Sequence, residues 1–229
     1  MAKTYLFAGA SSSMALKTAS ILQKEGHHVI GLSTKENAYT YNQFYQVEKY
    51  ENSFLPIIDT PIDGLVYFPG TINLKPFNRL TAKDFVTDYE INALGAVAFT
   101  QFYLNQLKQS SSASIVFISS VAAQSGMPFH ASVAMAKAAL EGLTKSLAAE
   151  LAPIVRVNAI APSLTNTPLA DKFINTPEKT EASQKRNPMK KVGTPEEVGD
   201  AIAFLLSEKS SWITGQIIAV DGGMNNLKL

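Results

Sequence analysis

The sequence has 229 residues, of which 46% are apolar, with a formal net charge of +1 and no cysteine. Near-neutral charge without a long basic run argues against a nucleic-acid partner, the absence of cysteine excludes disulfides and cysteine zinc sites, and three histidines without clustered acidic residues predict no metal site. No apolar run is long enough for a signal peptide or a membrane span, so we expect a soluble cytoplasmic protein with no membrane partner.

The N-terminal third alternates between strand and helix patterns. KTYLFAGA (3–10) predicts a buried strand that runs into a glycine turn, SMALKTASILQKEG (13–26) a helix, and HHVIGLS (27–33) a second strand. Residues 34–62 are rich in Tyr, Asn and Gln and indicate only a short strand, FYQVEKY. GLVYFPG (64–70) predicts the next strand and a following turn.

The middle of the chain continues the alternation. A pattern similar to a capping box at Thr81 begins a helical pattern that runs to about Leu107. SASIVFISS (112–120) predicts a strand, residues 131–151 a helix, and PIVRVNAIAPS (153–163) another strand.

The C-terminal part ends in one more helix and strand. Thr194 as N-cap, Pro195 at the first helical position and Glu197 at the third are a strong helix start, and WITGQIIAVDGG (212–223) predicts the last strand. Strands that alternate with helices imply a parallel sheet covered on both faces. We therefore expect a single doubly wound α/β domain over residues 1–229, with ligands at the carboxyl ends of the strands.

The first turn, AGASSSMA (8–15), has the features of a phosphate-binding loop. Gly9 permits a tight turn, and the small side chains of Ser11, Ser12 and Ser13 let backbone N–H groups approach a pyrophosphate at the helix N-terminus. The usual fingerprint has three glycines and this stretch has one. A plain strand-to-helix turn therefore explains the same residues equally well.

A lysine lies on the apolar face of the helix predicted over residues 131–151. Lys137 follows Val133 by four residues and so shares its face. A buried ammonium group is costly unless something pairs with it, which makes Lys137 a candidate ligand-binding residue; a surface lysine that extends to solvent is the alternative. The apolar stripe contains Val133, Ala136, Leu140, Leu143, Leu147 and Leu151.

Several motifs follow one another in a familiar order: IVFISS, Lys137 on its helix, RVNAIAPSLTNTP, PEEVGDAIAFLLS and ITGQIIAVDGG. With these motifs the chain resembles the short-chain dehydrogenase/reductase family from end to end. The resemblance implies a single Rossmann-type domain of about seven parallel strands with helices on both faces, which binds NAD or NADP. It also implies assembly as a homotetramer or homodimer and a small-molecule substrate.

The resemblance implies an active-site set of Asn, Ser, Tyr and Lys. Asn92 in EINALGA matches the asparagine, Ser120 the serine, and Lys137 the lysine of the Tyr-x-x-x-Lys motif. The tyrosine position is occupied by Val133, which has no proton to give. Lys137 resembles the lysine that binds the cofactor ribose, whose hydroxyl groups would pair its buried ammonium.

Further cofactor contacts follow from the same resemblance. Thr167 in SLTNTP matches the threonine that meets the nicotinamide carboxamide, and Leu164 matches the residue whose backbone meets the same group. Gly70 ends YFPG, which stands where the family has Asn-Asn-Ala-Gly. Ser13 and Ala15 replace the later glycines of the first loop, so the departures concentrate around the cofactor and the chemistry.

The end of the second strand predicts the cofactor. NAD-preferring members carry an acidic residue there that binds the ribose hydroxyls. This position is Ser33, followed by Thr34 and Lys35, so no acid is present and Lys35 is placed to meet a 2′-phosphate. NADP is therefore predicted rather than NAD; a solvent-directed Lys35 is the alternative.

The missing tyrosine leaves three candidates for the proton donor. Enoyl-thioester reductases of this family carry their tyrosine seven residues before the lysine, where this chain has His130, and histidine exchanges protons near neutral pH. Tyr67 at the end of a strand, or a water held by Lys137 and Asn92, are the others. A loop histidine without a role is the alternative for His130.

The leading hypothesis is an oxidoreductase that transfers a hydride between NADP(H) and an unknown carbonyl or enoyl substrate. Its catalytic residues would be Asn92, Ser120, Lys137 and His130. The alternative is a catalytically impaired nucleotide-binding protein with a sensor or regulatory role, because the tyrosine is missing. An oligomeric scaffold without nucleotide is a third. Residues 164–192, which would cover the substrate, are polar and do not identify it.

Overall fold

Seven parallel strands form one sheet in the computed structural model, which describes residues 2–36 and 40–227. The strand order is β3-β2-β1-β4-β5-β6-β7, which confirms the expected doubly wound sheet of about seven parallel strands. The strands are β1 (Thr4–Ala8), β2 (His28–Ser33), β3 (Gln43–Gln46), β4 (Gly64–Tyr67), β5 (Ala113–Ile118), β6 (Val155–Pro162) and β7 (Ile217–Val220).

The central strands are short apolar runs because both of their faces are buried. All six residues of β5 are buried, and Leu65 of β4 pairs with Leu6 of β1 on one side and Ile115 of β5 on the other. These three side chains point to the same face, since register neighbours in a parallel sheet share a direction. The sheet centre is thus a continuous apolar layer.

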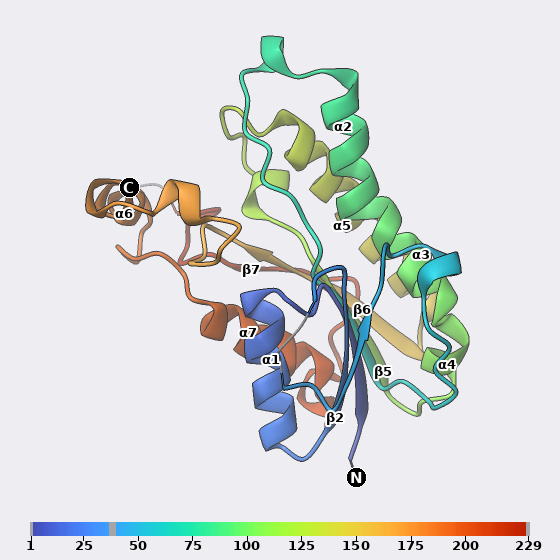
Figure 1. Cartoon of the computed structure of the whole chain (residues 1–229). Helices are drawn as coiled ribbons and strands as arrows, with labels where there is room; N and C mark the ends of the chain where they lie inside the picture. The colour runs from blue at the N-terminus through green and yellow to red at the C-terminus, as the bar shows by residue number, and fades with distance from the viewer. Residues whose placement is uncertain (1, 37–39, 228–229) are drawn as a thin grey trace.

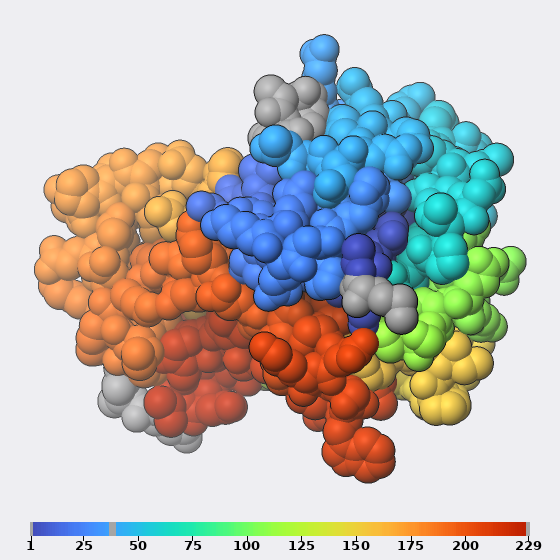
Figure 2. Space-filling view, turned by 90° about the horizontal axis from the view of Figure 1, so that it is seen from below, coloured from blue at the N-terminus to red at the C-terminus, as the bar shows by residue number. Residues whose placement is uncertain are grey.

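Helices cover the two faces of the sheet (Figure 1). One face carries α1 (Ser13–Lys24) and α7 (Pro195–Leu206), and the other carries α3 (Gly95–Phe102), α4 (Leu104–Lys108) and α5 (Ala131–Leu151), with α2 (Ala82–Tyr89) packed on α5. Figure 2 shows that the N-terminal segment lies beside the C-terminal third, where Lys3 pairs with Glu208 at 2.9 Å.

The helix starts follow the capping signals in the sequence. The hydroxyls of Thr81 and Thr194 each accept a hydrogen bond from the backbone N–H three residues later. The carboxylates of Asp84 and Glu197 accept one from the backbone N–H of the capping threonine, which completes two capping boxes. Pro195 occupies the first turn of α7, where its missing N–H is not needed.

The long helix predicted from Thr81 to Leu107 is interrupted. One turn of π-helix over Glu90–Leu94 separates α2 from α3, and a break at Tyr103 separates α3 from α4. Gly95 follows the π-helical turn because the buried phenol of Tyr67 lies against it: a Cβ at Gly95 would lie 2.1 Å from the Tyr67 oxygen. The hydrophobic spacing alone does not reveal this interruption.

Two further segments differ from a regular alternation. Residues 47–63, all described, contain only a 3-10 turn at Asn52–Phe54; the short strand expected within FYQVEKY (44–50) is β3, which already ends at Gln46. The polar stretch 164–192, for which the sequence predicted no element, contains α6 (Pro177–Arg186), capped by Thr176. Residues 48–51 of the first segment and much of the second line the cavity at the carboxyl ends of the strands, next to the switch point between β1 and β4.

Two glycine substitutions test the interrupted helix. Gly95→Ala forces a methyl group against a buried tyrosine, so we expect a loss of roughly 1–3 kcal/mol in the free energy of unfolding. Gly142 is an exposed residue of α5, and a Cβ there meets no atom within 4 Å. Gly142→Ala should therefore raise the free energy of unfolding by about 0.5–1 kcal/mol through helix propensity. Urea unfolding of both variants measures the difference, and equal effects would contradict the contact at Gly95.

Candidate active site

A large cavity opens at the carboxyl ends of β1, β4, β5 and β6, with a volume of about 1440 Å³. Every residue that the sequence assigned to catalysis or cofactor binding lines it, with the exception of Asn92. The lining includes Gly9, Ser11, Ser12, Ser13, Thr34, Lys35, Gly70, Ser120, His130, Lys137, Leu164 and Thr167. The fold therefore brings residues from both halves of the chain to one place.

The turn between β1 and α1 forms one end of this cavity. Gly9 has φ of +72°, a left-handed conformation that favours glycine, and its missing side chain lets Pro69 pack against it. The Ser12 hydroxyl accepts a hydrogen bond from Ala15 N–H at 3.2 Å and caps α1. The N–H groups of Ser13 and the next residue belong to the first helical turn and have no acceptor within the helix, so they are available to an anion.

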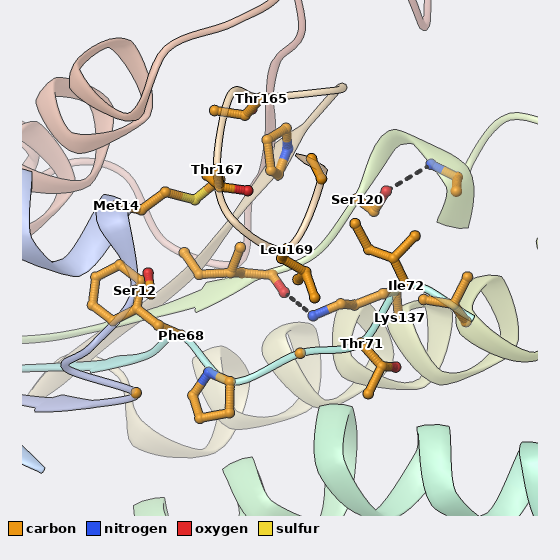
Figure 3. A pocket seen from close by; sticks show the side chains of 18 of the residues that line it. Ser12, Met14, Phe68, Thr71, Ile72, Ser120, Lys137, Thr165, Thr167 and Leu169 are labelled. Atoms are coloured by element: carbon orange, nitrogen blue, oxygen red, sulfur yellow. Dashed lines mark hydrogen bonds between the residues drawn. The ribbon is translucent and has the colours of Figure 1, made fainter. Parts of the chain in front are cut away.

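Lys137 is the buried cation of the site, with 6% of its surface exposed. Its Nζ donates a hydrogen bond to the carbonyl of Ile118 at 2.6 Å (Figure 3). Gly70 lies directly beside it, since a Cβ there would lie 3.2 Å from Nζ. Burial lowers the pKa of Lys137 to about 7. The lysine is therefore not a surface residue that extends to solvent.

Asn92 does not line the cavity but lies behind the residues that do, next to Gly70 and Thr71. Its side-chain NH₂ donates to the Thr71 hydroxyl at 2.8 Å and to the Asp88 carbonyl at 2.7 Å, and its Oδ1 accepts from Thr71 N–H at 3.3 Å. The Thr71 hydroxyl in turn donates to the Asp88 carboxylate at 2.6 Å. Asn92 thus holds the loop beside Gly70. Sequence reasoning missed Thr71 and Asp88, which have no motif of their own.

Ser120 lies on the cavity wall just after β5. Its hydroxyl oxygen accepts a hydrogen bond from Ala122 N–H at 3.2 Å, which leaves the hydroxyl proton free to be donated. In Figure 3, Ser120 lies at one end of the cavity, and Ser12, Met14 and Thr167 lie together at the other. The Ile118 carbonyl that binds Lys137 precedes Ser120 by two residues on the same segment.

The start of α5 carries Val133, at the expected tyrosine position, and His130, the candidate donor three residues before it. Val133 lines the cavity with a buried side chain. His130 is the N-cap residue of α5, and its Nδ1 lies 2.7 Å from the Pro128 carbonyl. A carbonyl only accepts, so Nδ1 carries the proton and Nε2 is the nitrogen left for exchange.

Tyr67 does not fit the proton-donor role that its position in the sequence predicted. It is 1% exposed, and its hydroxyl donates to the Ile91 carbonyl at 2.8 Å. Burial raises its pKa well above the ordinary value for a phenol. That candidate is therefore wrong: the Tyr67 proton is held within the core.

Residues 164–192 form a cover over the cavity. Leu164 and Thr167 line it near the α1 end, and the Lys172 ammonium donates to the Ile72 carbonyl at 3.0 Å, which joins the cover to the loop after β4. Lys179 supports this contact by donating to the carbonyl of Lys172 at 3.1 Å. The sequence carried no signal for these long-range contacts.

The far end of the cavity lies beyond β2. Thr34 and Lys35 line it, as does Tyr50 from the segment after β3. Ser33, the last residue of β2, is buried, and its hydroxyl accepts from Lys35 N–H at 3.0 Å. Glu48 and Glu51, on either side of Tyr50, also line the cavity. Within residues 2–36 and 40–227, no group of three or more His, Asp or Glu side chains is arranged to hold a metal ion, and no helix is long and apolar enough to cross a membrane.

Comparison with known proteins places this geometry in context. A family model described as enoyl-(acyl carrier protein) reductase matches residues 9–225. The 3-oxoacyl-[acyl-carrier-protein] reductase FabG of Rickettsia felis is 34% identical over 235 residues, covering 97% of this chain and 96% of that protein. A tropinone reductase homolog of Arabidopsis thaliana is 37% identical over 167 residues, 72% of this chain but only 54% of the relative.

Solved structures agree with the whole fold. The ligand-free aldohexose dehydrogenase of Thermoplasma acidophilum superposes with a TM-score of 0.91 at 26% identity, covering 99% of this chain and 95% of that one. ElxO with NADP bound superposes with a TM-score of 0.87, also at 26% identity, covering 99% and 100% of the two chains. The architecture is shared over its full length.

The buried lysine predicts a pH dependence of stability. Below about pH 7, Lys137 is charged in both states and the folded protein bears the full cost of its burial. Between about pH 7 and the unfolded value of 10.5, only the unfolded chain binds that proton, so stability rises with pH by up to about 1.4 kcal/mol per unit. Lys137→Met should lack this rise.

Urea unfolding from pH 6 to pH 10 without nucleotide measures the effect. The difference in free energy of unfolding between wild type and Lys137→Met should grow in favour of the wild type as pH rises. Lys145→Met, an exposed position on the same helix, is the matched control and should follow the wild type. Parallel curves for wild type and Lys137→Met would contradict the depressed pKa.

Proposed function

The chain belongs to the short-chain dehydrogenase/reductase family of oxidoreductases, and from this premise we propose that it transfers a hydride between NADP(H) and a carbonyl or conjugated enoyl carbon of a small molecule. The observation that carries the proposal is the single cavity lined by the α1 N-terminus, Lys137, Ser120 and Thr167. When bound, NADP(H) supplies or accepts the hydride; the protein supplies orientation, hydrogen bonds and the proton.

The residues at the α1 end fit the phosphates of a dinucleotide. The free N–H groups at the start of α1 and the small side chains of Ser11 and Ser13 fit the pyrophosphate. Thr34 and Lys35 lie at the adenosine end, where the absence of an acid at Ser33 and the cation of Lys35 favour a 2′-phosphate. The NADP held by the similar protein ElxO supports the same choice.

At the nicotinamide end, the contacts with the cofactor would be made by Lys137, Leu164 and Thr167. Lys137 has one hydrogen bond, to Ile118, and its remaining N–H donors fit the ribose hydroxyls. Leu164 and Thr167 fit the carboxamide from the covering segment. Asn92 contributes through the loop: its amide is engaged with Thr71, so it keeps Gly70 against Lys137 rather than touching the ligand.

The proton step falls to Ser120 and His130. The free hydroxyl proton of Ser120 is donated to the substrate oxygen, which orients it and stabilises developing charge. Protonated His130 gives its Nε2 proton to that oxygen as the bond to hydrogen forms at carbon. Val133 supplies only an apolar side chain to the cavity, so Lys137 would act on ribose and water and not on a phenol.

Relatives indicate the kind of carbonyl without fixing it. The matched model is described for enoyl-(acyl carrier protein) reductases and FabG is named for 3-oxoacyl groups, whereas a structural neighbour is an aldohexose dehydrogenase. Both an enoyl and a ketone carbon are therefore retained in the proposal. We further propose a cytoplasmic homotetramer or homodimer.

The second candidate is a nucleotide-binding protein without turnover, with a sensor or regulatory role. Val133 is the observation that favours it, since no phenol lies four residues before Lys137. Tight binding of NADP(H) without hydride transfer to any acceptor would support this candidate over the first.

Nucleotide affinity tests the proposal directly. Titration followed by NADPH fluorescence should give tighter binding of NADPH than of NADH, by roughly tenfold or more for a charge-assisted phosphate contact. Lys35→Ala should weaken NADPH by about the same factor and leave NADH unchanged. Equal affinities in the wild type would contradict the NADP choice, and no binding of either would leave only a scaffold.

His130→Ala tests the proton donor. Turnover with a carbonyl or enoyl substrate found by screening should fall by roughly 10²–10⁴-fold, because general acid catalysis contributes that much. NADPH affinity should not change, since among the described residues the His130 side chain is hydrogen-bonded only to the Pro128 carbonyl. Unchanged turnover would remove His130 from the mechanism and leave a water beside Lys137.

A further inference from the structure

The turn after β1 carries one glycine, yet two tyrosines from distant segments bond to its backbone. The Tyr50 hydroxyl accepts a hydrogen bond from Gly9 N–H at 2.8 Å. The Tyr41 hydroxyl donates to the Ala10 carbonyl, also at 2.8 Å. One tyrosine thus satisfies a donor and the other an acceptor of adjacent residues in the same turn.

Tyr41 reaches the turn across β2. Gly31 makes this path possible, because a Cβ there would lie 2.9 Å from both the Tyr41 ring and the Ala10 side chain. The Ala10 N–H also donates to the Leu32 carbonyl at 2.9 Å, so the turn is tied to β2 beside the tyrosine. The missing side chain at Gly31 is explained by this packing.

Tyr50 comes from residues 47–63, where the chain has no α-helix and therefore runs close to the turn. Its ring packs edge-on against Tyr67 and Phe99, with centroids 5.7 Å and 6.1 Å away. These contacts fix the ring, and the hydroxyl also donates to the Leu32 carbonyl at 3.3 Å. A ring held on two sides is part of the frame and not a movable gate.

The ionisation state of Tyr50 suits this bridging role. Burial raises its pKa to about 12, so the phenol keeps its proton at neutral pH. It therefore remains both acceptor and donor, joining the β1 turn to the end of β2. A phenolate would lose the bond to Leu32.

We infer that Tyr41 and Tyr50 are positioning residues for the nucleotide phosphates, clamping the Gly9–Ala10 turn so that the free N–H groups of α1 face the cavity. The inference rests on the proposed function, because it supposes that a dinucleotide binds there. It explains how a loop with Ser13 and Ala15 in place of glycines keeps its shape. Tyr50 also lines the adenosine end of the cavity, so its loss acts at that end.

The experiment uses the full chain and two probes: NADPH, and 2′,5′-ADP, which represents the adenosine half. Tyr41→Phe removes the hydrogen bond to Ala10, and Tyr50→Phe removes those with Gly9 and Leu32. Each variant should weaken both probes by about tenfold or more. Tyr103→Phe is the matched control. It removes a similar bond from a buried tyrosine, to the Pro56 carbonyl at 2.8 Å, and Tyr103 does not line the cavity.

Lys137→Met separates the two ends of the cavity. It should weaken NADPH but not 2′,5′-ADP, whereas the clamp variants weaken both. Urea unfolding of each tyrosine variant shows whether stability falls equally in all three. A binding loss confined to Tyr41→Phe and Tyr50→Phe, at stability matched to Tyr103→Phe, supports the clamp.

Two results would overturn the inference alone: wild-type binding of NADPH that is unaltered in both clamp variants, or an equal loss in Tyr103→Phe, which would indicate general loosening. Failure of the wild type to bind either probe would instead remove the proposed function, and the clamp with it. The wild-type titration therefore separates the two failures.

Discussion

The burial of the Lys137 ammonium is the constraint on which the site depends. A cation with a single acceptor, the Ile118 carbonyl, is expensive to keep in the interior, and its pKa near 7 expresses that cost. Three segments must meet for this arrangement: the apolar face of α5, the end of β5, and the loop at Gly70, whose missing side chain leaves room for the amine. A leucine there would avoid the cost of a buried amine, and this cost is the physical reason for proposing that Lys137 binds a ligand.

Most of the strands and helix starts could be predicted because they depend on residues close together in the sequence. Apolar runs of strand length, the capping residues Thr81 and Thr194, and the glycine at position 9 each act within a few residues of themselves. The convergence of Ser120, Lys137 and Thr167 was predictable too, since parallel strands bring their carboxyl ends to one edge. The family resemblance supplied which of these residues to compare.

The rest depends on contacts between distant segments, which spacing does not encode. The π-helical turn at Glu90–Leu94 is tied to a tyrosine that donates to its backbone from β4, and this turn directs the Asn92 amide to Thr71 rather than into the cavity. Tyr67 seemed a donor by its place at a strand end, but its depth in the core was visible only in three dimensions. The helix α6 has no buried residue and is capped by Thr176. Its sequence has too weak a hydrophobic period for the helix to be predicted.

Val133 changes what the surviving residues must do. With a phenol four residues earlier, a charged lysine assists proton release from oxygen; beside valine, the same ammonium faces an apolar wall, the Ile118 carbonyl and the cavity. In the proposed reaction, the proton for a reduced substrate would come from His130, at the N-cap of the same helix, or from a water bound by the amine. His130 caps α5 and Lys137 belongs to it, so both proposed proton sources are positioned by the same helix. Valine in place of the tyrosine therefore removes a proton donor but leaves Ser120 and Lys137 on the cavity wall. Turnover would then depend on whether an imidazole or a water reaches the substrate oxygen that Ser120 is proposed to bind.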